Sequence, residues 1–304
     1  DSVRLTATIR DVVAGVNLAD VEVVGLAQRM DLVVDSATVA LIEGLSRTRP
    51  IAAVKLAIAQ SQSLPALQAY LTGEQFFRRA AWDSANGYYA RAAELDPAFA
   101  QAIHRIYQTR LLQGTGSDSL IWGRGLRAGQ LNRGLPVRDS LIIATDSLMA
   151  AMFQQTRAES ADLQAMAKRI LAGLEFAAQR FPDDPEIWYH LGFVRDRIGW
   201  RLGAGPKEVL EAVDRAIVLD SAFAPAYALA LPYVLTVQGK DRARRLVSRY
   251  LALDPLGHSA AAARLVRLLL DPRADQATEV SQLLDTVSAL ALHSAQGVFD
   301  RWPD

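Results

Sequence analysis

The tripeptide Leu-Asp-Pro, or its variant Leu-Asp-Ser, closes three copies of a helix-pair pattern in this 304-residue chain and constrains the fold more than any other feature. The three endings begin at Leu95, Leu219 and Leu253. Proline lacks the backbone N–H that a helix needs and restricts the residue before it, so the two Asp-Pro endings predict a helix stop and a turn. The third residues of the last two endings, Ser221 and Pro255, lie 34 positions apart. A period of this length indicates stacked supersecondary units.

Small residues recur inside the stretches that precede these endings. Gly73 and Gly192 fall in the first helix of a predicted pair, and Ala85 falls in a second helix. Small side chains at these places would let two helix backbones approach closely. Each pair then leaves one apolar side uncovered, so the pairs must stack on one another. We predict a helical array over 51–304, ending in a capping helix at about 274–292.

The segment 188–192, Trp-Tyr-His-Leu-Gly, resembles the first-helix signature of the tetratricopeptide repeat (TPR) family. The resemblance extends over 64–269 and implies a mainly α fold, a TPR-like array of helical hairpins or α-solenoid. The pattern is degenerate, because 114–180 is helical by periodicity but departs from the family consensus. Extra residues also interrupt the second copy at 199–206, and 98–113 resembles a first helix without a recognisable partner.

A short α/β piece is predicted ahead of the array, over 1–50. Four apolar residues alternate with polar ones at its start, namely Val3, Leu5, Ala7 and Ile9. Alternation of this kind predicts a strand with one buried face. Turn residues at 14–17 and a change to helical spacing from about residue 28 then predict a hairpin followed by a helix. Two strands and one helix are marginal alone, so the piece either packs on the array or pairs with strands upstream of Asp1.

The order of these parts resembles the sensory half of certain bacterial signalling proteins. There, a piece similar to the TolB amino-terminal domain precedes an Ala/Tyr-rich helix, here 66–71, and then Leu-Asp-Pro repeats. The family places this half after a serine/threonine kinase, a cyclase or a winged-helix regulator, often following one membrane helix. The resemblance implies a sensor module, located in the periplasm or outside the cell if such a helix lies upstream and in the cytoplasm otherwise. Membrane contact is then expected only through that anchor.

Composition and charge restrict the partners. Half of the residues (51%) are hydrophobic, which suffices for a sizeable core, and no cysteine is available for disulfides or thiolate chemistry. Lys+Arg and Asp+Glu number 33 each, so no overall field attracts nucleic acid and none is expected as a partner of this segment. The uncharged run 221–239 is about long enough to span a bilayer. Its two prolines and many alanines instead predict a buried helix.

Motifs for catalysis or cofactors are weak. None of the four histidines stands in a zinc-type helix motif, and His190 is expected to pack or to lie at the surface. The glycine-rich loop 203–208 lacks the ending of a phosphate loop, and Pro206 removes an N–H that a phosphate would need. The carboxylates Asp96, Asp220 and Asp254 belong to the repeat endings and are expected to cap or turn the chain. We therefore expect no cofactor, no metal and no catalytic residue.

The concave surface is the candidate binding site that the TPR resemblance implies, because first helices line that surface in the family. Transferred to the two best-matched copies, the ligand-contacting positions are Tyr70, Glu74, Phe77, Arg78, Tyr189, Phe193, Asp196 and Arg197. Aromatic anchors combined with a few charges suit a peptide groove. The alternative is that Phe77 and Phe193 pack between helices. The basic stretch 240–249 is more simply a solvated helix face than an anion site.

Two functions from different classes follow. The favoured one is a non-catalytic module that binds a protein or peptide through the concave surface, within a bacterial signalling protein. The alternative is a structural subunit or assembly scaffold packed permanently in a larger complex. An enzyme is a distant third hypothesis.

Overall fold

A computed structural model of the chain describes residues 2–11, 15–30, 33–34, 36–38, 40–41, 61, 63–113, 119–155, 159–253, 258–270 and 277–286. At the amino-terminal end β1 (Ser2–Asp11) and β2 (Val16–Leu26) form an antiparallel hairpin, followed by the short 3-10 turn η1 (Ala27–Arg29). The predicted alternation is confirmed, since every second residue of β1 is partly buried and the rest are exposed. The predicted boundary between 1–50 and 51–304 falls outside the described residues.

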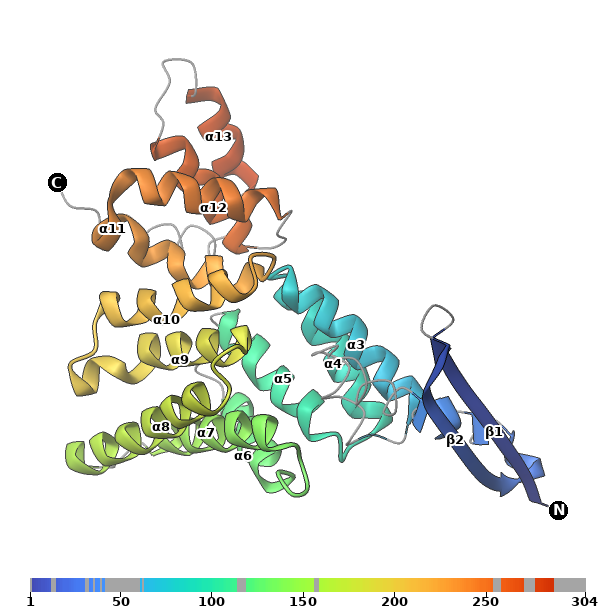
Figure 1. Cartoon of the computed structure of the whole chain (residues 1–304). Helices are drawn as coiled ribbons and strands as arrows, with labels where there is room; N and C mark the ends of the chain where they lie inside the picture. Colours follow the sequence, from blue (N-terminus) through green and yellow to red (C-terminus); the bar gives the residue numbers. More distant parts are fainter. Residues whose placement is uncertain are drawn as a thin grey trace.

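The helix predicted after the hairpin is confirmed where the chain is described, because 33–34, 36–38 and 40–41 are helical. Val33 packs directly over β2. A Cβ added at Gly25 would lie 2.5 Å from Val33 Cγ2, so glycine is what allows this helix to approach the strand. Figure 1 shows the hairpin to one side of the helical array.

The rest of the described chain is helical. Its elements in order are α3 (Leu64–Arg78), α4 (Trp82–Leu95), α5 (Ala100–Leu112), α6 (Ser119–Gln130), α7 (Val137–Gln154), α8 (Ser160–Arg180), α9 (Pro185–Ile198), η2 (Gly199–Leu202), α10 (Pro206–Leu219), α11 (Ala224–Ala252), α12 (His258–Leu270) and α13 (Ala277–Thr286). Consecutive helices pack against each other along the whole series (Figure 1). The fold is therefore the expected one, an α-solenoid of helical hairpins with a short amino-terminal α/β piece.

The two well-described repeat endings share one geometry. Asp96 and Asp220 end their helices with φ/ψ of −140°/94° and −141°/94°. Each carboxylate accepts a hydrogen bond of 3.0 Å from the backbone N–H two residues on. The prediction that these aspartates turn the chain is confirmed, whereas Asp254 lies outside the described residues.

Glycines set the distances between helices, as the spacing predicted. A Cβ at Gly73 would lie 2.6 Å from the ring of Tyr89 in α4, and one at Gly192 would lie 2.6 Å from Val213 in α10. The helix predicted over 98–113 is present as α5, and the partner that the sequence pattern did not reveal is α6. α6 contacts α5 through a glycine: Gly125 lies against Tyr107 of α5, where a Cβ would be 3.0 Å from the ring.

The carboxyl-terminal part follows the prediction in outline. The uncharged run forms the buried first half of α11, which Gly239 interrupts with a φ of +78°. None of the described helices is both long and apolar enough to cross a bilayer. The predicted capping helix is present as α13, and the remainder of 274–292 lies outside the described residues.

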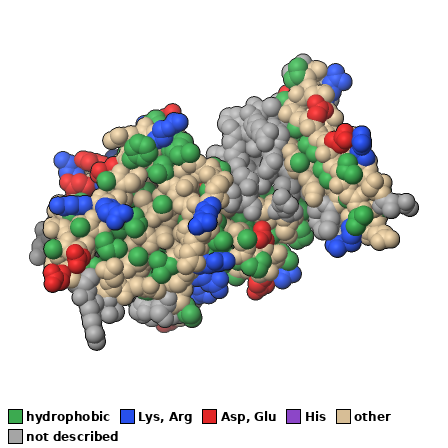
Figure 2. Space-filling model, turned by 90° about the horizontal axis from the view of Figure 1, so that it is seen from below, with side chains coloured by type: hydrophobic (Ala, Val, Ile, Leu, Met, Phe, Trp, Pro, Cys, Tyr) green, Lys and Arg blue, Asp and Glu red, His purple; other side chains and the backbone are tan. Residues whose placement is uncertain are grey.

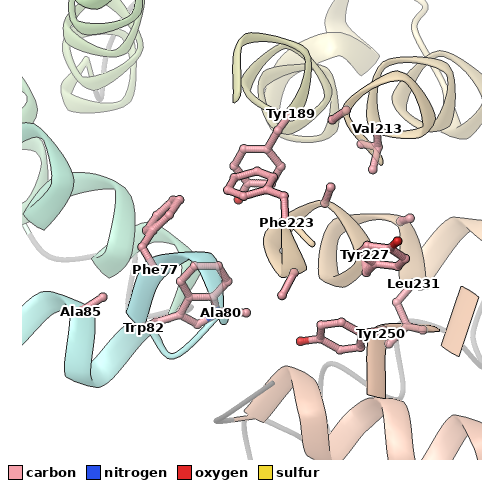
Figure 3. Packing of buried hydrophobic residues seen from close by; sticks show 14 of the residues in the cluster. Phe77, Ala80, Trp82, Ala85, Tyr189, Val213, Phe223, Tyr227, Leu231 and Tyr250 are labelled. Carbon is pink, nitrogen blue, oxygen red and sulfur yellow. The ribbon is translucent and has the colours of Figure 1, made fainter. Parts of the chain in front are cut away.

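The array curves until its first hairpin meets the turn between α10 and α11. The rings of Phe77 (α3) and Phe223 lie 6.3 Å apart, and Phe223 packs edge-on against Tyr189 of α9 at 5.3 Å. Figure 3 shows these side chains meeting in one cluster that continues to Tyr227 and Tyr250. The first and third sequence copies therefore share a core, and the inner side of the array is closed at this point.

Candidate functional site

A pocket of about 410 Å³ lies where the array closes. It opens between α3, the α8–α9 turn and the start of α11. Its lining combines aromatic and charged side chains: Tyr70, Glu74, Phe77, Arg78, Arg105, Arg138, Phe181, Pro182, Asp183, Asp184, Pro185, Glu186 and Phe223. A mixture of apolar surface and a few placed polar groups is typical of a binding site.

Arg105 of α5 forms one part of the pocket floor. Its Nε and Nη2 donate to the two carboxylate oxygens of Glu74 in α3, at 2.7 and 2.8 Å. Its Nη1 donates to Gln108 and pairs with Glu186 of α9. The guanidinium also lies over the ring of Phe77, 4.4 Å from its centroid. One buried arginine thus joins the inner helices of three hairpins.

Arg138 of α7 forms the other part. Its Nε and Nη2 donate to Asp184 at 2.8 and 3.2 Å, Nη2 also donates to Glu186 at 2.5 Å, and Nη1 donates to Asp139 at 2.9 Å. Burial alone would raise the pKa of Glu186, but Arg105 and Arg138 together hold the pKa of this carboxyl well below its usual range. Glu186 is therefore ionised at neutral pH and bridges two arginines.

Asp184 has a second role as the cap of α9. Its Oδ1 accepts hydrogen bonds from the backbone N–H groups of Glu186 and Ile187, at 3.0 and 3.2 Å. Pro185 occupies the first turn, where its missing N–H is not needed. The turn that begins α9 therefore also positions two of the pocket's carboxylates, Asp184 and Glu186.

Beneath the pocket, two histidines share one buried carboxylate. Asp146 of α7 accepts His104 Nε2 on one oxygen at 2.6 Å and His190 Nε2 on the other at 2.8 Å. Burial would raise the pKa of Asp146, but the two histidines outweigh it and hold that pKa well below its usual range. The predicted packing role of His190 agrees with its nearly complete burial. Among the described residues, no group of histidines and carboxylates has a geometry that would hold a metal ion.

Arg78 and Asp183 form the exposed rim. Arg78 donates to Asp220 at 2.5 Å and lies over Phe223, 5.7 Å from the ring centroid. Asp183 is almost fully exposed, and its ion pair with Arg215 is long at 3.5 Å. The rim therefore keeps one carboxylate free of close contacts.

The eight residues expected in the groove are divided by the structure. Tyr70, Glu74, Phe77 and Arg78 line the pocket together, but Tyr70 and Phe77 are also almost fully buried in the same core cluster as Tyr189, so Phe77 packs between helices as the alternative expected. Tyr189 and Phe193 are buried in the core. Asp196 and Arg197 lie at the far end of α9, about 15 Å along the helix from Glu186. There Asp196 accepts the hydroxyl of Tyr233, and Arg197 donates to the carbonyl of Leu111.

Most of the charged floor was not predictable from the sequence. Four polar residues of α5 lie on one helical stripe that is typical of a solvent face: Gln101, His104, Arg105 and Gln108. All four are buried, because α5 is surrounded by neighbouring helices. The helical spacing of His104 and Gln108 was visible in the sequence, but their partners lie in α7 and α9 and no local signal identifies them.

The other candidate motifs are structural. The loop 203–208 joins helices as predicted, and Glu208 accepts the N–H of Gly205 at 2.8 Å to cap α10. In the basic stretch, Arg242 pairs with Asp214 at 3.0 Å on the surface. Acidic and basic side chains are interspersed over the face seen in Figure 2.

No family model and no curated protein sequence matches this chain. Solved structures do match. A thermophilic TPR protein of Thermus thermophilus is 15% identical, with a TM-score of 0.43, over 77% of this chain and 99% of that one. YrrB, described as a TPR protein with an unusual peptide-binding site, is 16% identical, with a TM-score of 0.33, over 66% and 91%.

A third match is the Cut9–Hcn1 hetero-tetramer of the APC/C. It is 14% identical, with a TM-score of 0.42, over 91% of this chain and 52% of that one. The assignment of a helical-hairpin array is based on the helix packing described above. These weak similarities carry no information on the chemistry of the pocket.

Proposed function

We propose that this chain is a non-catalytic module that binds a protein or peptide through the pocket between α3, the α8–α9 turn and Phe223. The observation that carries the proposal is the pocket itself. It brings Tyr70, Glu74, Phe77 and Arg78 from the first repeat into one cavity with residues more than a hundred positions away. Aromatic side chains beside charged ones are the usual anchors of a protein interface.

The proposal confines binding to a small part of the inner face. Because arginine–carboxylate pairs fill the space between the inner helices, a long peptide has no continuous groove to follow. A single side chain or short segment of a partner fits a cavity at the lower end of the size range of binding sites. The order of the α/β piece and the array supports a place for the module in a bacterial signalling protein.

Selection from a randomised peptide library displayed on phage tests this function. We expect selected peptides to bind the full chain and to lose at least about tenfold in affinity for Pro182→Trp, which fills the pocket mouth without changing a charge. Val218→Trp, at an exposed position of α10 outside the pocket lining, is the matched control and should bind like the wild type. Far-UV circular dichroism verifies that both variants are folded. Peptides that bind all three proteins equally would contradict the proposal.

A further inference from the structure

We propose that the pocket recognises a cationic side chain, a guanidinium or ammonium group, carried by the partner polypeptide. This inference rests on the proposed function and adds the chemical class of the ligand. It follows from which hydrogen-bonding groups of the pocket are already used and which remain available.

The donors on the pocket floor are committed. Arg138 donates from all three guanidinium nitrogens to carboxylates, namely those of Asp139, Asp184 and Glu186. Arg105 likewise donates from all three of its nitrogens, to Glu74 and Gln108, and pairs with Glu186. An anionic ligand at the pocket floor would have to displace a carboxylate from Arg105 or Arg138, which leaves that carboxylate unpaired and is strongly unfavourable.

In contrast, some hydrogen-bond acceptors of the pocket remain available to a ligand. An ionised carboxylate offers about four lone-pair sites. Four carboxylates line the pocket against three arginines, and the third arginine, Arg78, is paired with Asp220 outside the lining. Asp183 is 88% exposed at the rim, with only the 3.5 Å contact to Arg215. A ligand that donates hydrogen bonds and carries positive charge therefore meets unused acceptors.

The aromatic surface favours the same ligand. Two guanidinium groups of this chain already lie over rings of the pocket, Arg105 over Phe77 at 4.4 Å and Arg78 over Phe223 at 5.7 Å. Attraction between a cation and the face of a ring strengthens when water is excluded. Phe181 lines the same cavity beside Asp183 and is partly exposed, although Arg180 already lies over its ring at 5.3 Å from the centroid. A further cation would therefore meet the exposed part of this ring and the carboxylate of Asp183.

The test compares heptapeptides that differ at one central residue: arginine, its uncharged near-isostere citrulline, or glutamate. Binding is followed by NMR through the indole N–H of Trp188, which donates to the carbonyl of Pro182 in the pocket wall at 2.9 Å. We expect the arginine peptide at millimolar concentration to shift this resonance and to bind at least about tenfold more tightly than the citrulline peptide. Equal binding of the two, preference for glutamate, or no shift with arginine would overturn the inference.

A charge-neutral variant localises the effect. Asp183→Asn should lower the affinity for the arginine peptide by about threefold or more and leave the affinity for the citrulline peptide unchanged. Asp241→Asn is the matched control, because Asp241 is similarly exposed at 83% and pairs with Arg244 at 3.1 Å, outside the pocket lining. Equal loss with both variants would overturn the assignment to this pocket.

The two proposals fail in different ways. If Pro182→Trp blocks library peptides whose anchors are neutral or acidic, the proposed function stands and the cationic specificity is wrong. If no selected peptide depends on the pocket, the proposed function itself is wrong.

Discussion

The inner helices of the first two hairpins, α3 and α5, are of similar length but bury different chemistry. α3 buries an almost wholly apolar stripe that ends at Phe77. α5 buries a stripe of polar and charged side chains in addition to its apolar residues. The repeat consensus therefore locates helix pairs, but it does not locate the groups that join non-adjacent hairpins, which lie both in matched helices, such as Glu74 and Glu186, and in a helix off the consensus, Arg138 of α7. In this chain those groups are arginines and carboxylates that close the inner face.

The largest expected effect comes from removing the charge at the centre of α5. Arg105→Met leaves Glu74 without its arginine partner and Glu186 with Arg138 alone, so we expect urea unfolding to show a loss of about 3–5 kcal/mol in the free energy of unfolding. Arg91→Met in α4 removes only an exposed i,i+3 pair with Glu94 and should change stability by less than about 0.5 kcal/mol. A loss below about 1 kcal/mol for Arg105→Met would mean that α5 is not held by buried charge.

Two glycine-to-alanine substitutions test the apolar packing of the first hairpin. We expect them to change the free energy of unfolding by smaller amounts and in opposite directions. Gly73→Ala places a methyl group 2.6 Å from Tyr89 and should destabilise by about 1–3 kcal/mol. Gly87→Ala, in α4, meets nothing within 4 Å and should stabilise by about 0.5–1 kcal/mol, because alanine has the higher helix propensity. Thermal unfolding of both variants, compared with the wild type, measures the two stability changes. The same sign for both would contradict close packing at Gly73.

These two comparisons also show which parts of the fold can be predicted from the sequence. Alternation predicted the hairpin at Val3–Ile9, and periodicity predicted α7 and α8 although both depart from the consensus. The position of Gly73 predicted a close helix pair. In contrast, the contact between Phe77 and Phe223 depends on the accumulated curvature of several hairpins. Small rotations between successive hairpins decide that curvature, and no local pattern encodes them.

The pocket was therefore predictable only in part. The TPR resemblance placed Tyr70, Glu74, Phe77 and Arg78 on one inner face, and these four do share the cavity. The same resemblance placed Tyr189 and Phe193 on the corresponding face of α9, where both are buried in the core. Arg138 and Glu186 carried no motif, because an ion pair between distant helices leaves no spacing in the sequence.

The smallest expected effect concerns pH. Burial lowers the pKa of His104, and the hydrogen bond to Asp146 only partly opposes it, while Arg105 and His190 lower it further. The folded state thus binds this proton less readily than the unfolded chain, so stability is lost as the pH falls below about 6.5. His104→Gln should make the unfolding free energy less dependent on pH between about 5 and 7, by at most one proton. Identical slopes for both proteins would contradict this.

Whether the inner face is closed by buried charge can be tested by arginine modification with phenylglyoxal, read out by mass spectrometry on the native chain. Arg105 and Arg138 have side chains that are 7% and 12% exposed, whereas Arg78 and Arg197 are 44% and 40% exposed. We expect Arg78 and Arg197 to react while Arg105 and Arg138 stay unmodified until the protein is denatured. Reaction of all four at similar rates would mean that the inner face is an open groove and that the closed network does not exist.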